Sequence, residues 1–214
     1  MELLMKIGKG MFPDEWKESP FAIDFEDYYK KGYKGIVFDI DNTLVPHGKP
    51  AAKETADLFE KLRNIGFEMV IVSNNERERV ETFCASLGCK GVWKAHKPDT
   101  KGYFKACRSM GLSPASVLCI GDQLITDIHG GNNSGMHTIL VNPITRAEEI
   151  QVIAKRKLEA PFIFIYRIML KIKKQQFPKR RLPAGKSILT DNMGNEISLL
   201  QLIKQKRSSK DQGL

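Results

Sequence analysis

IVFDIDNTLV (residues 36–45) combines the pattern of a buried strand with two carboxylates. The run is apolar and β-branched and has no turn residue before Asn42, as in a strand covered on both faces of a parallel sheet. Asp39 and Asp41 interrupt it, one residue apart. Because burying a carboxylate is costly unless hydrogen bonds or a cation compensate, the two side chains predict a site with electrostatic partners nearby.

The strand pattern returns along the chain and alternates with amphipathic helices. Strands are expected at 35–44, 67–75, 91–95, 116–121 and 137–143, and helices at 51–66, 76–88 and 99–111. This alternation predicts an α/β fold, a Rossmann-like three-layer sandwich with a central parallel sheet. Sites in such sheets form where the carboxyl ends of the strands meet.

The expected strand ends carry residues suited to phosphate chemistry. In chain order they are Asp39-Ile40-Asp41-Asn42-Thr43, Ser73-Asn74-Asn75, Lys97-Pro98 and Gly121-Asp122, with Asp127 five residues further on. Carboxylates facing one crevice repel each other, and oxygen ligands without a His/Cys cluster favour Mg²⁺ over zinc. The Ser73 hydroxyl and the Lys97 ammonium suit phosphoryl oxygens. A carboxylate beside the metal can attack phosphorus, while a second one on the same side of the strand transfers protons.

Taken in order, these segments resemble the four motifs of the haloacid-dehalogenase (HAD) phosphohydrolases. DIDNT matches the D-x-D-x-T motif, and SNN, Lys97-Pro98 and GDQLITD match the second, third and fourth. FPDEW, AIDF, KGYKGIVFDIDNTLV and GDQLITDIHGGN are similar to the YqeG-like HAD-IIIA branch, which is related to mitochondrial phosphatidylglycerophosphate phosphatases. The resemblance covers roughly residues 10–145 and implies a HAD-like fold.

The resemblance also implies roles for the acidic residues. Asp39 would be the nucleophile and a metal ligand. Asp41 would be the general acid/base and would bind the metal through its backbone carbonyl. Asp122 would hold Mg²⁺, and Asp127 would ligate it through water or orient Lys97.

Four residues are expected to serve the substrate. Ser73 and Asn74 would bind the transferring phosphoryl group, Lys97 would neutralise its charge as a catalytic residue, and Thr43 would brace the loop. Structural roles remain open: the 73–75 segment can cap the next helix, Lys97 can be a solvated loop lysine, and Asp127 can cap the segment after it. The histidines are expected at the surface or in structural roles; they are His47, His96, His129 and His137.

Short distances between the motifs limit the substrate. Only 29 residues separate Thr43 from Ser73, and 21 separate Asn75 from Lys97. Each interval is consumed by one expected helix and one strand, so we expect a capless enzyme. An open site suits a phosphate on a bulky carrier such as a lipid, a protein or a nucleic acid, although a neighbouring subunit can supply a lid.

The positive charge is concentrated after the predicted core. Residues 155–181 hold ten Lys/Arg and one acid, whereas residues 1–154 hold 19 Lys/Arg and 21 acids. As a helix, the segment 158–181 has an apolar stripe beside a basic one, which is typical of helices at anionic membrane surfaces. Packing on the core, dimer formation and, less favoured, nucleic-acid binding are the alternatives. Part of it, 166–173, also alternates like a strand.

Composition favours a cytoplasmic protein, peripheral to the inner face of the membrane if the basic segment binds there. The sequence predicts no signal peptide and no transmembrane run, and its four cysteines form no C-x-x-C pair. Three parts are expected: an N-terminal lead-in packing on the core (1–34), the phosphatase core (35–150) and a basic C-terminal extension (151–214).

The expected function is a Mg²⁺-dependent phosphomonoester phosphatase with a phosphoaspartate intermediate. Its substrate would be bulky or lipid, such as phosphatidylglycerophosphate. A soluble sugar phosphate or nucleotide, with a lid from oligomerisation, is one alternative. A non-catalytic partner-binding module is another.

Overall fold

The computed structural model describes residues 10–145 and 158–168. Two compact units are distinguished: described residues up to Phe162 belong to the first, and the second begins at Ile163. Of the second unit, only 163–168 are described, as the later part of a helix at 158–168. The predicted membrane segment therefore falls partly outside the described residues, from 169 to 181.

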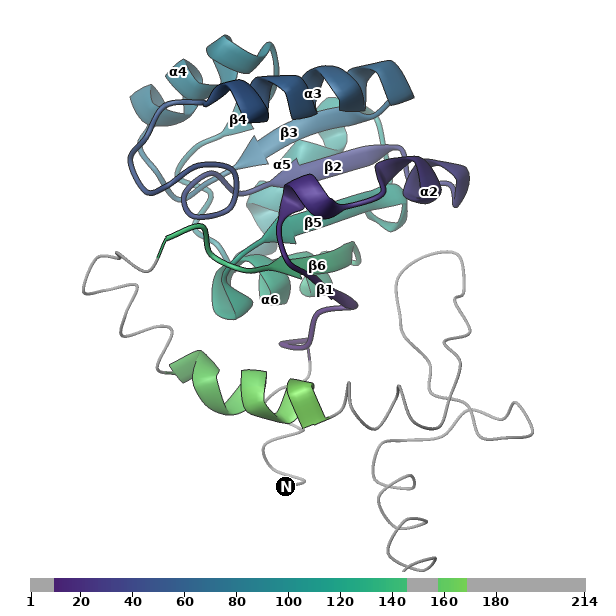
Figure 1. The fold of residues 1–214 in the computed structure, drawn as a ribbon, viewed down its shortest axis with the longest axis vertical. Coiled ribbons are helices and arrows are strands. Elements are labelled where there is room, and N and C mark those ends of the chain that lie inside the picture. The colour runs from purple at the N-terminus through teal and green to yellow at the C-terminus, as the bar shows by residue number, and fades with distance from the viewer. Residues whose placement is uncertain (1–9, 146–157, 169–214) are drawn as a thin grey trace, which may run out of the picture. The chain divides into compact units, whose positions relative to one another are not determined.

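Within residues 10–145, six strands form one sheet in which all neighbours are parallel (Figure 1). They are β1 Glu15–Lys17, β2 Gly35–Phe38, β3 Glu68–Val72, β4 Lys90–Val92, β5 Val117–Gly121 and β6 His137–Val141, in the spatial order β1-β6-β5-β2-β3-β4. The predicted α/β fold with a parallel sheet is confirmed. The chain order reverses between β2 and β5, so a topological switch point lies at the centre of the sheet, where ligands bind in such folds.

The helices occupy the intervals between the strands. They are α2 Phe25–Lys30, α3 Lys53–Ile65, α4 Arg77–Leu87, α5 Thr100–Met110 and α6 His129–Asn133, with short turns η1 Pro20–Ala22, η2 Pro114–Ser116 and the π-helical η3 Leu124–Ile128. α3 and α4 end at Gly66 and Gly88, both left-handed (φ 105° and 63°), a backbone conformation that glycine adopts without steric cost.

Alternation along the buried strands divides the core between the two faces of the sheet. On β2, Ile36 and Phe38 belong to one apolar cluster, which includes side chains of α2, α3 and α4. Val37 belongs to the other, with Tyr103 of α5. The helices thus cover both faces, as predicted.

The lead-in contributes a strand that the sequence analysis did not predict. β1 pairs with β6 at the sheet edge, with Trp16 opposite Leu140. Its sequence, EWK, is only partly buried and has no apolar run. In the part of the chain that the structure describes, no helix has the length and apolarity required to cross a membrane.

Candidate active site

The carboxyl ends of β2 and β5 place two predicted aspartates side by side. β2 ends at Phe38, and the backbone N–H of the next residue, Asp39, donates to the Ile120 carbonyl at 3.1 Å. β5 ends at Gly121, and Asp122 follows. Because β2 and β5 are hydrogen-bonded neighbours, the sheet itself fixes the spacing of the two side chains.

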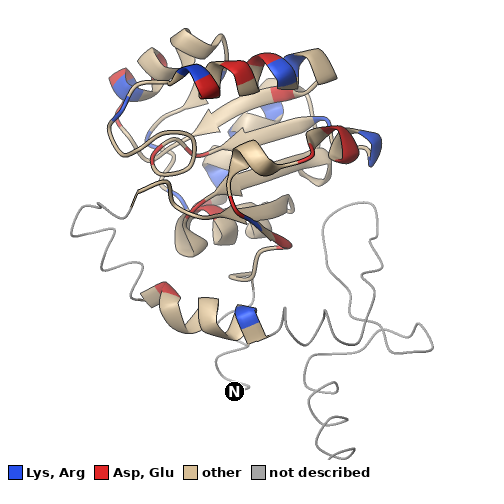
Figure 2. Ribbon diagram, in the orientation of Figure 1, with Lys and Arg blue, Asp and Glu red and all other residues tan. Residues whose placement is uncertain are grey.

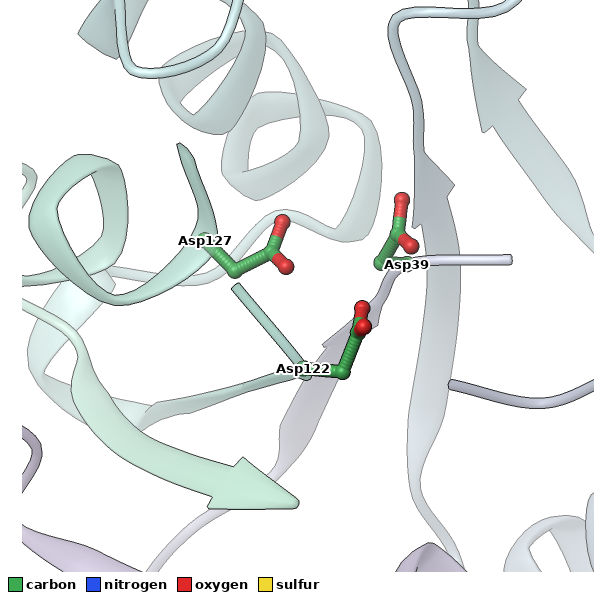
Figure 3. Close-up of side chains that lie close together, drawn as sticks. All are labelled: Asp39, Asp122 and Asp127. Atoms are coloured by element: carbon green, nitrogen blue, oxygen red, sulfur yellow. The ribbon is translucent and has the colours of Figure 1, made fainter. Parts of the chain in front are cut away.

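A third carboxylate completes a cluster at this edge. Asp39, Asp122 and Asp127 point toward one another in Figure 3, and one oxygen of each lies within 4.8 Å of the others. All three side chains are buried. Asp127 comes from η3 and approaches closely because residue 121 is glycine: a Cβ at Gly121 would overlap the Asp127 carboxylate. Three of the four predicted metal ligands thus lie together.

Lys97 is the cation of this cluster. Its Nζ lies 2.5 Å from Asp39 Oδ1 and 2.7 Å from Asp127 Oδ1, and the residue is only 8% exposed. The interpretation of Lys97 as a solvated loop lysine is therefore wrong. Asn74 holds the lysine backbone from both sides, since its Oδ1 accepts from Lys97 N at 2.7 Å and its Nδ2 donates to Lys97 O at 3.3 Å.

The cluster contains more negative than positive charge. Burial raises the pKa of Asp39 to about 8; Lys97 opposes this shift, and Asp127 and Asp122 add to it. Burial by itself lowers the pKa of Lys97, but Asp127 and Asp39 outweigh it and raise that pKa. Three buried carboxylates facing one ammonium fit a hard divalent cation, which binds oxygen ligands and would supply the missing positive charge.

Asp41 lies outside the cluster, in different surroundings. It follows the end of β2, so the alternation expected within a strand does not apply to it. Its carboxylate accepts from Asn75 Nδ2 at 2.5 Å, Gly48 N at 2.9 Å and Arg79 NH2 at 3.2 Å. Burial raises the pKa of Asp41, but the hydrogen bonds from Asn75, Gly48 and Arg79 outweigh burial and hold it below its usual value.

Thr43 and Ser73 are both buried, and Thr43 contacts the cluster. The Thr43 hydroxyl donates to Asp122 Oδ1 at 3.1 Å, which links the loop after β2 to this carboxylate. The Ser73 hydroxyl accepts from Asn75 N at 3.2 Å. Ser73 therefore does not cap α4, whose N-cap is Glu76 and has no side-chain cap.

Two other structural alternatives are also decided. Asp127 accepts from the preceding Gln123 N at 3.1 Å and does not cap a later segment. His137 is buried between Asp14 and Glu15, with its Nε2 3.2 Å from Glu15 Oε1, which agrees with a structural role. His47 Nδ1 lies 4.0 Å from Asp41 Oδ1.

Sequence reasoning missed the partners of Asp41. Asn75 is the last residue of the second motif, SNN, which was a usable signal. Arg79 lies in a charged helix segment, ERERVE, where solvated side chains are the norm, and Gly48 binds through its backbone. Nothing in the residue pattern indicated that Arg79 and Gly48 contact Asp41.

Comparisons with known proteins agree with this site. Residues 95–158 match a protein family described as HAD-hydrolase-like. The chain is 39% identical over 152 residues to the "Probable phosphatase YqeG" of Bacillus subtilis. The aligned region covers 71% of this chain and 88% of that protein. It is 26% identical over 181 residues to the "Phosphatidylglycerophosphate phosphatase 1, chloroplastic/mitochondrial" of Arabidopsis thaliana, covering 79% of this chain and 49% of the relative.

Among solved structures, one similar chain is the cobalt-bound deoxy-D-mannose-octulosonate 8-phosphate phosphatase of Haemophilus influenzae. The TM-score is 0.45 and the identity 13%, over 52% of this chain and 69% of that one.

Proposed function

The chain belongs to the HAD superfamily of hydrolases, with the probable phosphatase YqeG among its relatives, and we propose that it hydrolyses phosphomonoesters through a phosphoaspartate on Asp39. The observation that carries the proposal is the placement of Asp39. Its carboxylate is buried at a strand end, beside Lys97 and two further carboxylates suited to a metal.

In the first half-reaction, an Asp39 carboxylate oxygen attacks phosphorus. The bond from phosphorus to Asp39 forms while the bond to the leaving oxygen breaks, and that oxygen takes a proton from Asp41. Asp41 is ionised in the resting arrangement, so it must first gain this proton. The approach of an anionic phosphate raises its pKa and favours protonation.

In the second half-reaction, Asp41 accepts a proton from water as the water attacks phosphorus. The bond between phosphorus and Asp39 breaks, which returns the Asp39 carboxylate and releases inorganic phosphate. We propose Mg²⁺ as the cation, held by Asp39, Asp122, Asp127 and the Asp41 carbonyl; when bound, it would neutralise charge on the phosphoryl oxygens. Ser73 would donate a hydrogen bond to the phosphoryl group, and Asn74 would serve it by positioning Lys97.

The proposed substrate is a phosphomonoester on a bulky or lipid carrier, phosphatidylglycerophosphate first. Two observations support this. In residues 44–72 the chain forms α3 and β3 and no inserted cap domain, which leaves the site accessible to a large leaving group. A relative at 26% identity is named a phosphatidylglycerophosphate phosphatase.

The same proposal includes a location. A cytoplasmic enzyme that reaches such a substrate would bind the inner face of an anionic membrane, and the basic segment 158–181 is the candidate for that contact. The described part of this segment, 158–168, is helical, the conformation of amphipathic segments that lie at membrane surfaces. The three parts 1–34, 35–150 and 151–214 remain our proposed domain organisation.

A panel of phosphomonoesters tests the proposal. It includes phosphatidylglycerophosphate in vesicles, soluble sugar phosphates and nucleotides, each with and without Mg²⁺, on wild type and Asp39→Asn. We expect Mg²⁺-dependent phosphate release, fastest on the lipid, and loss of about 10⁴-fold or more in the variant. Preference for a soluble phosphate would overturn the substrate, and full activity of Asp39→Asn would overturn the mechanism.

A further inference from the structure

The turn that carries Asp127 is held by a residue that none of the HAD motifs contains. Glu159 is the second residue of the helix 158–168 and belongs to the same compact unit as the turn. Its side chain is completely buried, and Oε1 accepts a hydrogen bond from the backbone N–H of Ile125 at 2.9 Å. Ile125 lies two residues before Asp127 in η3.

This turn requires support from outside its own backbone. π-helical turns are rare, and the first N–H groups of any helix have no partner within it. Here the N–H groups of Asp127 and Ile128 both donate to the Gln123 carbonyl, and Gln123 N donates to Asp127 Oδ2. The N–H of Ile125 instead donates to the side chain of Glu159, 34 residues later in the chain.

A second contact holds the next residue of the turn. The Tyr103 hydroxyl, from α5, donates to the Thr126 carbonyl at 2.9 Å. Directly after Ile125 and Thr126, Asp127 reaches Lys97 and joins Asp39 and Asp122. The direction of the Asp127 carboxylate thus depends on a short segment fixed from two separate elements.

We infer that Glu159 is a positioning residue for the metal site, and that the first turn of the helix after the HAD core is therefore part of the active-site framework. Glu159 is not a metal ligand; it acts through the backbone of Ile125. The bond joins a completely buried carboxyl group to a backbone N–H, so it fixes the position of Ile125 relative to the residue that holds it. Figure 2 shows the acidic colour near the start of this helix and the basic colour toward its end.

The inference rests on the proposed metal site, and Mg²⁺ titration of the metal-free full-length protein by calorimetry tests it. Glu159→Ala should raise the Mg²⁺ dissociation constant about tenfold or more, the usual effect of losing support behind a ligand. Glu159→Gln keeps a neutral acceptor and should raise the Mg²⁺ dissociation constant roughly threefold. Glu60→Gln, an exposed glutamate of α3, is the matched charge control and should match wild type.

Thermal unfolding with and without Mg²⁺ separates positioning from a merely structural role. Positioning predicts that the variants lose part of the Mg²⁺-induced rise in Tm. Equal losses of Tm in both conditions, with an unchanged Mg²⁺ dissociation constant, would overturn the inference. If Glu159→Ala does not fold, Glu159→Gln decides by the same two measurements. Failure of wild type to bind Mg²⁺ would overturn the proposed cofactor and this inference together, whereas unchanged affinity in the variants would overturn only the inference.

Discussion

Two aspartates from one strand end, Asp39 and Asp41, lie in opposite surroundings. The Asp39 carboxylate lies beside two further carboxylates and the Lys97 ammonium. Its pKa is raised to about 8, and burial is the largest cause. Asp41 is more exposed and is surrounded by hydrogen-bond donors, which hold its pKa below the usual value against the effect of burial. Two identical side chains separated by one residue are thus set up for different electrostatic roles.

The difference in environment supports the roles proposed for the two aspartates. The surroundings of Asp39 hold three carboxylates and only one ammonium, that of Lys97, so the Asp39 carboxylate is suited to share a further cation and then attack an electrophile held there. The surroundings of Asp41 keep its carboxylate ionised, so it has a free site for a proton, and the proposed role as a base requires a bound phosphate to raise its pKa. The comparison therefore predicts that substitutions of the two aspartates block different steps.

Of the predicted effects that distinguish the two aspartates, the largest is expected from Asp41→Asn. Turnover of an alkyl phosphomonoester should fall about 10²–10⁴-fold, because proton transfer to the leaving oxygen and from water is lost. p-Nitrophenyl phosphate needs no proton on its leaving group, so phosphorylation of Asp39 should continue while hydrolysis slows. Mass spectrometry of the acid-quenched protein should then detect a phosphoryl adduct.

Asp39→Asn is the matched control for this experiment, since it cannot form the adduct. If neither variant accumulates phosphoenzyme, or if Asp41→Asn retains wild-type turnover, the proposed division between nucleophile and proton donor is contradicted.

A second prediction concerns pH. In the metal-free protein, the raised pKa of Asp39 means that the folded state binds a proton that the unfolded state, with a pKa of 3.8, has released. This contribution to stability is present below about pH 4 and is lost as the pH rises through about 8. Mg²⁺ must displace the proton, so its affinity should increase with pH, up to about tenfold per unit, and level off above about pH 8.

Calorimetry in buffers of different ionisation enthalpy measures the released proton. Asp41→Asn should leave this release unchanged, because Asp41 is already ionised, whereas Asp39→Asn should abolish it. An affinity independent of pH between about 6 and 8 would contradict the electrostatic account of Asp39.

Much of the fold and of the cluster could be predicted because both follow from strands. Strands buried on both faces are continuous apolar runs, and the sheet brings their carboxyl ends together; this is why Asp39, Ser73 and Asp122 were identified from their positions after such runs. β1 was missed because an edge strand of three partly buried residues has no apolar run.

The contacts of Asp41 and of the Asp127 turn could not be predicted in the same way. Arg79 and Glu159 reach the site from helices, and the distance along the chain from Glu159 to Ile125 contains no regular spacing that would indicate a contact. Such pairs depend on the path of the chain in space. Individually, a charged residue on a helix is usually solvated.

The smallest predicted effect tests the donor set around Asp41. Arg79 supplies its charged hydrogen bond and also donates to the Lys49 carbonyl at 2.6 Å, which ties the loop after Asp41 to α4. Arg79→Ala should raise the pKa of Asp41 and lower kcat on an alkyl phosphomonoester about three- to tenfold, with less effect on p-nitrophenyl phosphate. Arg77→Ala is the matched control, because Arg77 is exposed on the same helix and bonds Glu81 at 2.8 Å. Equal kinetics of the two variants would mean that the environment of Asp41 does not depend on Arg79, and the contrast with Asp39 would then rest on Asn75 and Gly48.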